Sequence, residues 1–116
     1  MEITQKRVAP GVLIISLAGE MDMYNSHELK ELVVQTYQTS SEPVIISMKD
    51  LKYIDSSGVS VLIYAYTQSK KAGIPLWFAH VDGTVRRVIE LTSLLNFFPI
   101  EASVEAAYAK AKQARP

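Results

Sequence analysis

The sequence has no cysteine, no net charge and no long hydrophobic run. Its 116 residues contain 0 cysteines, and 12 basic side chains balance 12 acidic ones. The lack of cysteine excludes disulfides, thiolate metal ligands and a cysteine nucleophile, and nothing favours an oxidising compartment. Without a surplus of lysine and arginine to neutralise phosphates, we expect no direct binding to nucleic acid.

The longest apolar stretch near the N-terminus runs only from Val12 to Leu17, followed by Ala18. It is shorter than the h-region of an export signal and far shorter than the ~20 residues of a membrane-spanning helix. The first residues also lack the basic-then-apolar order of such a signal. We therefore expect a cytoplasmic protein that does not enter a membrane.

The composition that remains is that of an ordinary globular protein. Hydrophobic residues make up 48% of the chain and charged residues 21%, which excludes disorder, collagen and coiled coil as descriptions of the whole. Glycine and proline are scattered singly, with no repeat and no linker. The length is typical of one domain, so we expect residues 1–116 to form a single domain.

Apolar runs bounded by turn residues predict five strands. A weak strand over 2–8 and a buried strand over 12–18 are joined by Ala9-Pro10-Gly11 and should form an antiparallel hairpin. The strand over 44–48 is apolar on both faces, and because a helix separates it from the previous strand, those two should be parallel. The last two strands are predicted at 76–79 and 97–100.

A first helix is predicted to begin at Asn25, after residues 19–22 have ended the preceding strand. Asn25 would cap this helix, and Glu28 would complete a capping box. Tyr24 would pack on Leu29 as a hydrophobic staple. Apolar residues then recur at helical spacing until a polar segment and a proline end the helix.

Three more helices are indicated by the same signals. The second opens at Asp55-Ser56-Ser57-Gly58 and ends at Gly73, with lysines in its last turn. Asp82 is placed to cap the third helix and Ser103 the fourth. The complete order ββαβαβαβα predicts an α/β fold, in which a mixed, mostly parallel sheet carries packed helices.

Two loops are the strongest candidates for a functional site. In sheets of this kind, functional residues gather beyond the carboxyl ends of the parallel strands. Residues 19–25 and 53–58 lie at two such ends, and if their strands are neighbours, the loops should share one surface patch. Glu20 and Asp22 could be paired acid and base groups, although closing a turn in solvent is the simpler interpretation.

The segment Asp55-Ser56-Ser57-Gly58 places one carboxylate and two hydroxyls at a strand-to-helix junction. Helix capping alone explains an aspartate followed by serine. One cap is enough, however, and a glycine in the first turn costs about 1 kcal/mol relative to alanine, so three small residues in a row also suggest room for a partner. Met21, Met23 and Tyr24, if exposed, would fit a protein contact at the same edge.

Catalysis and metal binding find little support in the sequence. A serine nucleophile needs a base, and the histidines are His27 and His80, neither of which has metal-ligand spacing to other ligands. The sequence lacks a phosphate loop and a nucleophile elbow. We expect no catalytic residue, no metal and no cofactor. The pair Arg86-Arg87 is typical of a solvated helix face.

Together these residues resemble a STAS domain of the stand-alone kind, the bacterial anti-sigma factor antagonists. Four stretches carry the likeness over essentially the whole chain, namely Gly19-Glu20-Met21-Asp22, Asp55-Ser56-Ser57-Gly58-Val59, Val85 to Thr92, and Phe97-Phe98-Pro99-Ile100 followed by Ser103 to Ala107. Two positions depart from the family pattern, because glycine is usual where this chain has Ser60 and Ser93.

The resemblance implies a phosphorylation switch. The unphosphorylated protein would capture an anti-sigma factor that is also a serine kinase and so free a sigma factor, and a PP2C-type phosphatase would reset the cycle. Ser56 would be the phosphoacceptor, with Ser57 as the second choice and Ser60 as a third hydroxyl. ATP would belong to the kinase.

The surface that meets the partner would draw on both loops. The residues expected to form it are Asp22, Met23, Tyr24, Asp55, Ser57 and Gly58. A phosphate adds about −1.5 to −2 charge, which a helix N-terminus accommodates while the aspartates repel it, so docking should fail although the fold persists. An alternative role is that of a STAS subunit in a lipid-transport ATPase or a stressosome-like complex. A monomer is expected, because nothing demands a large apolar interface.

Overall fold

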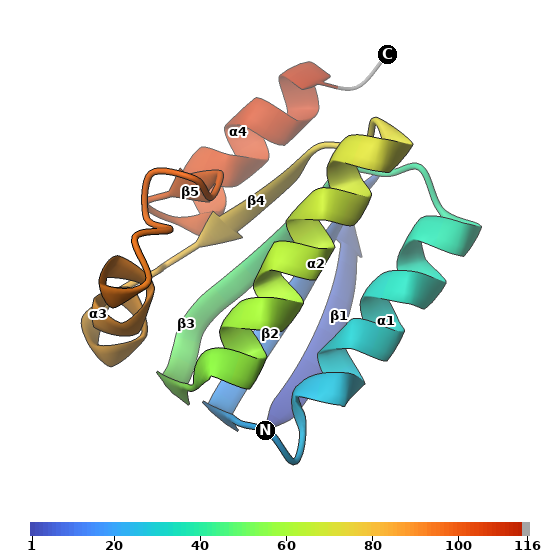
Figure 1. Cartoon of the computed structure of the whole chain (residues 1–116). Coiled ribbons are helices and arrows are strands. Elements are labelled where there is room, and N and C mark those ends of the chain that lie inside the picture. Colours follow the sequence, from blue (N-terminus) through green and yellow to red (C-terminus); the bar gives the residue numbers. More distant parts are fainter. Residues whose placement is uncertain (115–116) are drawn as a thin grey trace.

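The computed structural model describes residues 1–114 and contains a five-stranded sheet with four helices (Figure 1). The strands are β1 (Glu2–Val8), β2 (Val12–Met21), β3 (Val44–Ile54), β4 (Leu76–Ala79) and β5 (Ile100–Glu101). The helices are α1 (Ser26–Thr39), α2 (Ser56–Ala72), α3 (Gly83–Leu91) and α4 (Val104–Ala114). The predicted order ββαβαβαβα is confirmed. No helix within residues 1–114 is long and apolar enough to cross a membrane.

The sheet has the strand order β1-β2-β3-β4-β5. β1 and β2 form the predicted antiparallel hairpin, and β2 through β5 run parallel to one another. The expected α/β class with a mixed, mostly parallel sheet is therefore confirmed. The carboxyl ends of β2 and β3 meet at one edge of the sheet, because Met21 pairs with Ile54.

Helices cover both faces of the sheet. α1 and α2 lie side by side on one face, and α4 lies on the other (Figure 1). The larger core cluster joins the apolar faces of α1 and α2 to alternate residues of the strands, with Leu29 and Leu62 fully buried. A smaller cluster joins Ala107 and Ala111 of α4 to Val12 and Ile45. The alternation of side chains along each strand supplies both cores.

The central strands are longer than predicted. β2 does not end at Gly19 but continues to Met21, and β3 continues past Met48 to Ile54. Their extensions pair with each other, with register shifts between Ser16 and Ala18 and between Gly19 and Glu20. Gly19 has a φ of 91°, so it marks an irregularity inside the strand rather than the strand's end.

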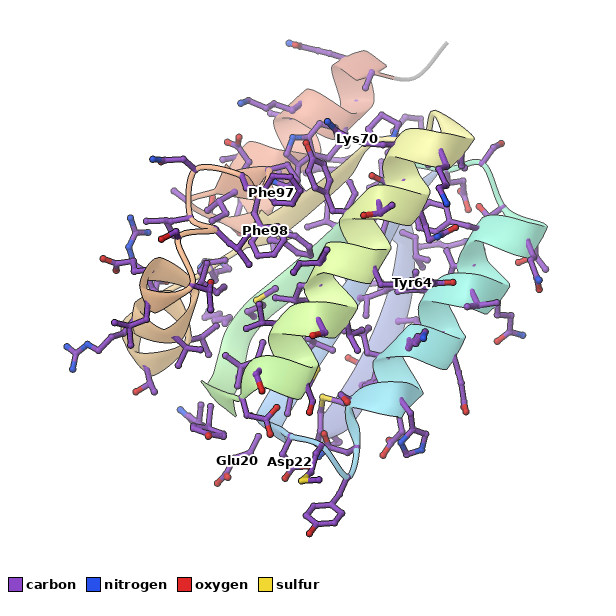
Figure 2. The ribbon with its side chains drawn as sticks, in the orientation of Figure 1. Glu20, Asp22, Tyr64, Lys70, Phe97 and Phe98 are labelled. Atoms are coloured by element: carbon purple, nitrogen blue, oxygen red, sulfur yellow. The ribbon has the colours of Figure 1, made fainter. Side chains whose placement is uncertain are left out.

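The last strand is shorter and later than predicted. Only Ile100 and Glu101 pair with β4, and Phe97 and Phe98 belong to the turn before them. The Phe98 ring packs edge-on against Phe78 of β4 at 5.1 Å between centroids (Figure 2). Phe98 therefore closes the core from a turn, whereas Phe97 is 47% exposed.

The start of α1 differs from the predicted capping box and staple. The Asn25 side chain does not cap α1 but accepts a hydrogen bond from the Asp22 amide and donates one to the Glu20 carbonyl, both at 2.9 Å. Tyr24 is 81% exposed, so it does not pack on Leu29. Asn25 therefore braces the loop instead of the helix.

The other helix ends follow the predicted signals more closely. Gly73 ends α2 in the left-handed conformation, and the Ser103 hydroxyl accepts a hydrogen bond from the Ala106 amide at the start of α4. Asp82 stands at the N-cap of α3, but its side chain makes no capping bond. After α3, Ser93 has a φ of 62°, a conformation that favours the glycine usual at this position in the resembled family.

Candidate functional site

The two candidate loops lie against each other at the edge where β2 and β3 end. The Asp55 amide donates a hydrogen bond to the Met21 carbonyl at 3.1 Å, which continues the pairing of the two strands. Figure 2 shows Glu20 and Asp22 at this edge, beside the start of α2. The prediction that the loops are neighbours is confirmed.

The carboxylate of Asp55 joins the two loops. Its Oδ1 accepts a hydrogen bond from the Gly58 amide, and its Oδ2 accepts one from the Met23 amide, both at 3.1 Å. The first bond caps α2, as the sequence predicts, and the second holds the neighbouring loop. Asp55 is therefore a brace between the loops as well as a negative charge at the surface.

Asp22 orders the β2–α1 loop in a similar way. Its Oδ1 accepts hydrogen bonds from the amides of Tyr24 and Asn25 at 2.9 and 3.2 Å. Asp22 therefore closes a turn, which is the simpler of the two interpretations that the sequence allowed for this residue. Glu20 is exposed.

The three serines at the start of α2 differ in exposure. Ser56 is the first residue of the helix and is exposed, whereas Ser57 is half-buried. Ser60, one turn further on, is exposed and donates its hydroxyl to the Ser56 carbonyl at 3.0 Å. Ser56 is thus the exposed hydroxyl nearest the brace made by Asp55.

The packing of α2 on the core requires glycine at position 58. It is buried, and a Cβ at this position would stand 2.5 Å from the Ile54 Cγ1 atom and 3.1 Å from the Met21 Cε atom. The expectation that Gly58 leaves room for a partner is therefore wrong, because the missing side chain leaves room for the core beneath α2.

The loop presents apolar side chains to solvent, as predicted for two of three residues. Met23 is 67% exposed and Tyr24 is 81% exposed, but Met21 is fully buried. The expectation for Met21 is wrong because β2 extends through this residue and turns its side chain into the core. Tyr53, which belongs to the second candidate segment and pairs with Glu20 of β2, is 41% exposed and adds a further exposed aromatic side chain.

The remaining polar candidates lie outside the two candidate loops. His27 is exposed on α1, and the Nε2 atom of His80, at the end of β4, accepts a hydrogen bond from the Val104 amide at 3.4 Å. Arg86 forms an exposed ion pair with Glu90 on α3 at 3.5 Å, which fits a solvated helix face. Within residues 1–114 no group of three histidine, aspartate or glutamate side chains could hold a metal ion.

Known proteins share this fold and its sequence pattern. The STAS domain family matches residues 4–107. The anti-sigma F factor antagonist of Paenibacillus polymyxa is 30% identical over 91 residues, which cover 78% of each chain.

Solved structures extend the likeness in fold. The anti-sigma factor antagonist SpoIIAA in its unphosphorylated form superposes with a TM-score of 0.80 at 19% identity, covering 97% of both chains. The Bacillus cell fate determinant SpoIIAA in its phosphorylated form gives a TM-score of 0.74 at 19% identity, covering 94% of this chain and 98% of that one.

Proposed function

The chain belongs to the STAS domain family, and from this we propose that it is an anti-sigma factor antagonist that switches partners on phosphorylation. The unphosphorylated form binds an anti-sigma factor that is also a serine kinase, and a sigma factor is thereby released. Phosphorylation of Ser56 by that kinase ends the binding, and a PP2C-type phosphatase restores it. The protein acts as a single-domain monomer in the cytoplasm.

The observation that carries this proposal is the exposed Ser56 hydroxyl beside an exposed apolar loop. Ser56 opens α2, and the Asp55 carboxylate ties that same helix turn to the backbone of Met23. A kinase that docks on Met23 and Tyr24 would therefore have the acceptor hydroxyl within its contact surface. Ser57 is half-buried, so it is the second choice.

The structure also supports distinct roles for the residues of the partner surface. The side chains of Met23 and Tyr24 offer contact area, since exposed methionine and tyrosine are common at protein interfaces. Asp22 and Asp55 hold the loop that presents them, and both add negative charge. Gly58 contributes by letting α2 lie close to the strands, not by direct contact.

A phosphate on Ser56 would alter docking without unfolding α2. It would stand at the N-terminus of a 17-residue helix, where the backbone amides and the helix dipole favour negative charge. Asp55 is the adjacent residue, and its carboxylate would repel the phosphate. Added bulk and added charge would both fall on the surface that the kinase meets.

The proposed role needs no catalysis by this chain. The relative from Paenibacillus polymyxa is by its name an antagonist of an anti-sigma factor. In the proposed cycle, the kinase would bind ATP. The protein would therefore be the substrate and the ligand of an enzyme.

The test uses an anti-sigma factor serine kinase from the same genome, with ATP, and follows intact mass. We expect one phosphate on the natural protein and on Ser57→Ala, and none on Ser56→Ala. Binding of the same kinase to Ser56→Asp should fall at least about tenfold, or about 1.4 kcal/mol, while its circular dichroism matches the natural protein. Full phosphorylation of Ser56→Ala, or undiminished binding of Ser56→Asp, would contradict the proposal.

A further inference from the structure

The backbone of the β2–α1 loop, residues 22–25, is held by side chains. Its four consecutive amides all donate hydrogen bonds to side-chain oxygens, at 2.9–3.2 Å. Two of the acceptor groups are the carboxylates of Asp22 and Asp55, and the third is the side-chain carbonyl of Asn25. A backbone that is bonded at every amide is ordered before a partner arrives.

Asn25 closes this loop. Its Oδ1 atom accepts the hydrogen bond of the Asp22 amide, and its Nδ2 atom donates to the carbonyl of Glu20 in β2, both at 2.9 Å. Because one partner can only donate and the other can only accept, the orientation of the Asn25 side-chain amide is fixed. The side chain thus joins the start of α1 to the end of β2, at the edge where Figure 2 shows Glu20 and Asp22.

The two bonds require asparagine at position 25. Aspartate has no donor for the Glu20 carbonyl, and serine has one oxygen where two polar atoms are needed. Both of those residues serve as N-caps about as well as asparagine does. Asn25, however, makes no capping bond with its side chain. The brace across the loop, and not the helix cap, therefore accounts for the asparagine.

The order of the loop matters for the two side chains that it presents. Met23 is 67% exposed and Tyr24 is 81% exposed, and because they are adjacent, the backbone sets the direction of each. A flexible loop would have to be ordered on docking, and the entropy lost in that step would weaken binding. A loop that is already fixed avoids this loss.

We propose that Asn25 is a positioning residue, which holds the β2–α1 loop so that Met23 and Tyr24 meet the anti-sigma factor kinase in one arrangement. This inference rests on the proposed function. Asn25 acts through the loop and does not need to touch the kinase. The Ser56 hydroxyl is carried by α2, so Asn25 should affect docking and not the transfer of the phosphate.

Asn25→Ser removes the brace and keeps an uncharged N-cap residue. Phosphorylation by the anti-sigma factor kinase is followed over a range of concentrations of the protein substrate. We expect KM to rise about three- to tenfold and kcat to stay within about twofold, because docking is weakened and the chemical step is unchanged. The thermal midpoint should be unchanged or raised, since serine is a good N-cap. A lower thermal midpoint with unchanged KM would assign Asn25 to the fold and overturn the proposal.

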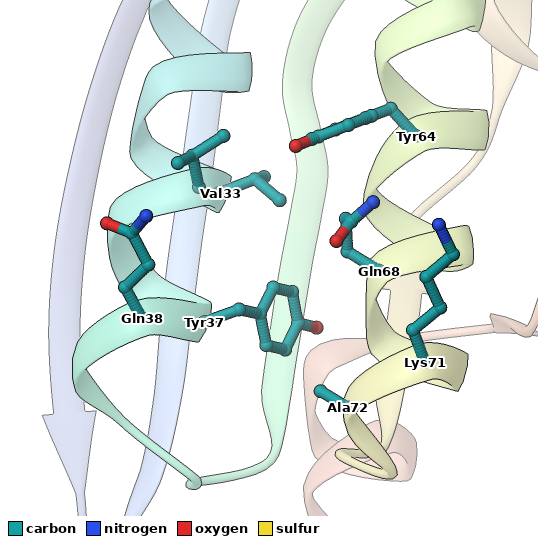
Figure 3. Close-up of a pocket in the computed structure, with 8 residues that line it drawn as sticks. Val33, Tyr37, Gln38, Tyr64, Gln68, Lys71 and Ala72 are labelled. Carbon is teal, nitrogen blue, oxygen red and sulfur yellow. The ribbon is translucent and has the colours of Figure 1, made fainter.

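Gln38→Ser is the matched control, because it removes the same side-chain amide group from the other end of α1. Gln38 is exposed in the last turn of α1, about 20 Å from Asn25 along the helix (Figure 3). This variant should leave both KM and kcat within about twofold of the natural values. An equal rise of KM in the two variants would show a general effect of α1 and would count against the proposal.

The order of the loop is measured in the free protein by ¹⁵N relaxation. The order parameters of the Met23 and Tyr24 amides should be about 0.85 in the natural protein and in Gln38→Ser, and near about 0.6 in Asn25→Ser. If they do not change in Asn25→Ser although KM rises, the lost affinity comes from a direct contact of Asn25, and the proposal is wrong.

A double-mutant cycle tests whether Asn25 acts through Tyr24. Tyr24→Ala should weaken kinase binding by itself. Adding Asn25→Ser should then cost less binding than it does in the natural protein, since the loop has one side chain fewer to present. A fully additive loss would mean that Asn25 affects binding by another route, against the proposal.

The natural protein is the reference for the proposed function and for the role of Asn25. If it neither binds the kinase nor accepts a phosphate, the proposed function is contradicted and the role of Asn25 falls with it. If it is bound and is phosphorylated on Ser56, and Asn25→Ser has the same KM, only the role of Asn25 is contradicted.

Discussion

Gly58 is the residue at which the candidate site and the core depend most directly on each other. A methyl group at this position would overlap Ile54, whose side chain is fully buried, and would press on Met21 below it. The close approach of α2 to the ends of β2 and β3 therefore requires glycine here. The same approach places Asp55 within reach of the neighbouring loop.

Gly58→Ala should destabilise the protein although alanine is the better helix former. Alanine gains about 1 kcal/mol in helix propensity, whereas overpacking a buried site costs about 1–3 kcal/mol. Because the 2.5 Å approach to the Ile54 Cγ1 atom places the cost in the upper half of that range, we expect the free energy of unfolding in urea to fall by about 1–2 kcal/mol. Ser60→Ala, on the exposed side of α2, is the control and should differ little from the natural protein.

The size of the Gly58→Ala effect should depend on the contact with Ile54. Adding Ile54→Val removes a methyl group near the clash and should return part of the lost stability, so the two changes should be non-additive. An unchanged free energy of unfolding in Gly58→Ala would show that the core relaxes around the new methyl group.

At the scale of elements, the sequence was a good guide to which helices and strands exist. Helical spacing in the second helix and β-branched runs in the central strands arise from local patterns, and the structure confirms them. The predicted ends of β2 and β3 were wrong, because the last residues of the two strands pair with each other and so extend both strands. The pairs Glu20 with Tyr53 and Met21 with Ile54 join residues that are far apart in the sequence.

The candidate site was predictable to a similar degree. Parallel pairing of β2 and β3 was enough to bring the two loops together, and Met23 and Tyr24 are exposed as expected. The brace that Asp55 provides to Met23 could not be predicted, since it depends on the loop's path in three dimensions. Asn25 likewise had a capping sequence but bonds to its own loop.

Two aspartates at helix N-caps offer a direct comparison of what a side-chain brace contributes. Asp55→Ala removes the acceptor for Gly58 and Met23 and should lower the free energy of unfolding by about 1–2 kcal/mol. Asp82→Ala alters an N-cap whose side chain makes no capping bond and should cost less than about 0.5 kcal/mol. Urea unfolding measures both.

Hydrogen exchange would locate the effect of Asp55→Ala. The Met23 amide should lose protection in Asp55→Ala, because its acceptor is gone, and keep it in Asp82→Ala. Equal losses of stability in the two variants would mean that neither the capping bond to Gly58 nor the bond to Met23 contributes, because Asp82 makes no capping bond.

At the scale of the whole molecule, the balance of charge sets the background for the proposed switch. Twelve basic and twelve acidic side chains give a net charge of zero, so one phosphate would take the chain to about −2. That charge would not be spread over the surface. It would fall at the start of α2, where Asp55 and Asp22 already lie, and α2 would keep its fold around it.

Salt can separate charge from bulk as the reason for failed docking. Exposed charges are screened over about 10 Å at 0.1 M salt and about 3 Å at 1 M. We expect the loss of kinase binding on phosphorylation of Ser56 to shrink several-fold between 0.05 M and 0.5 M salt, because salt screens repulsion between exposed charges. Ser56→Gln, which adds bulk without charge, should show a loss of binding that salt hardly alters. If the phosphorylated protein and Ser56→Gln respond alike to salt, bulk at the helix start is sufficient to block docking, and the charge of the phosphate is not what the partner detects.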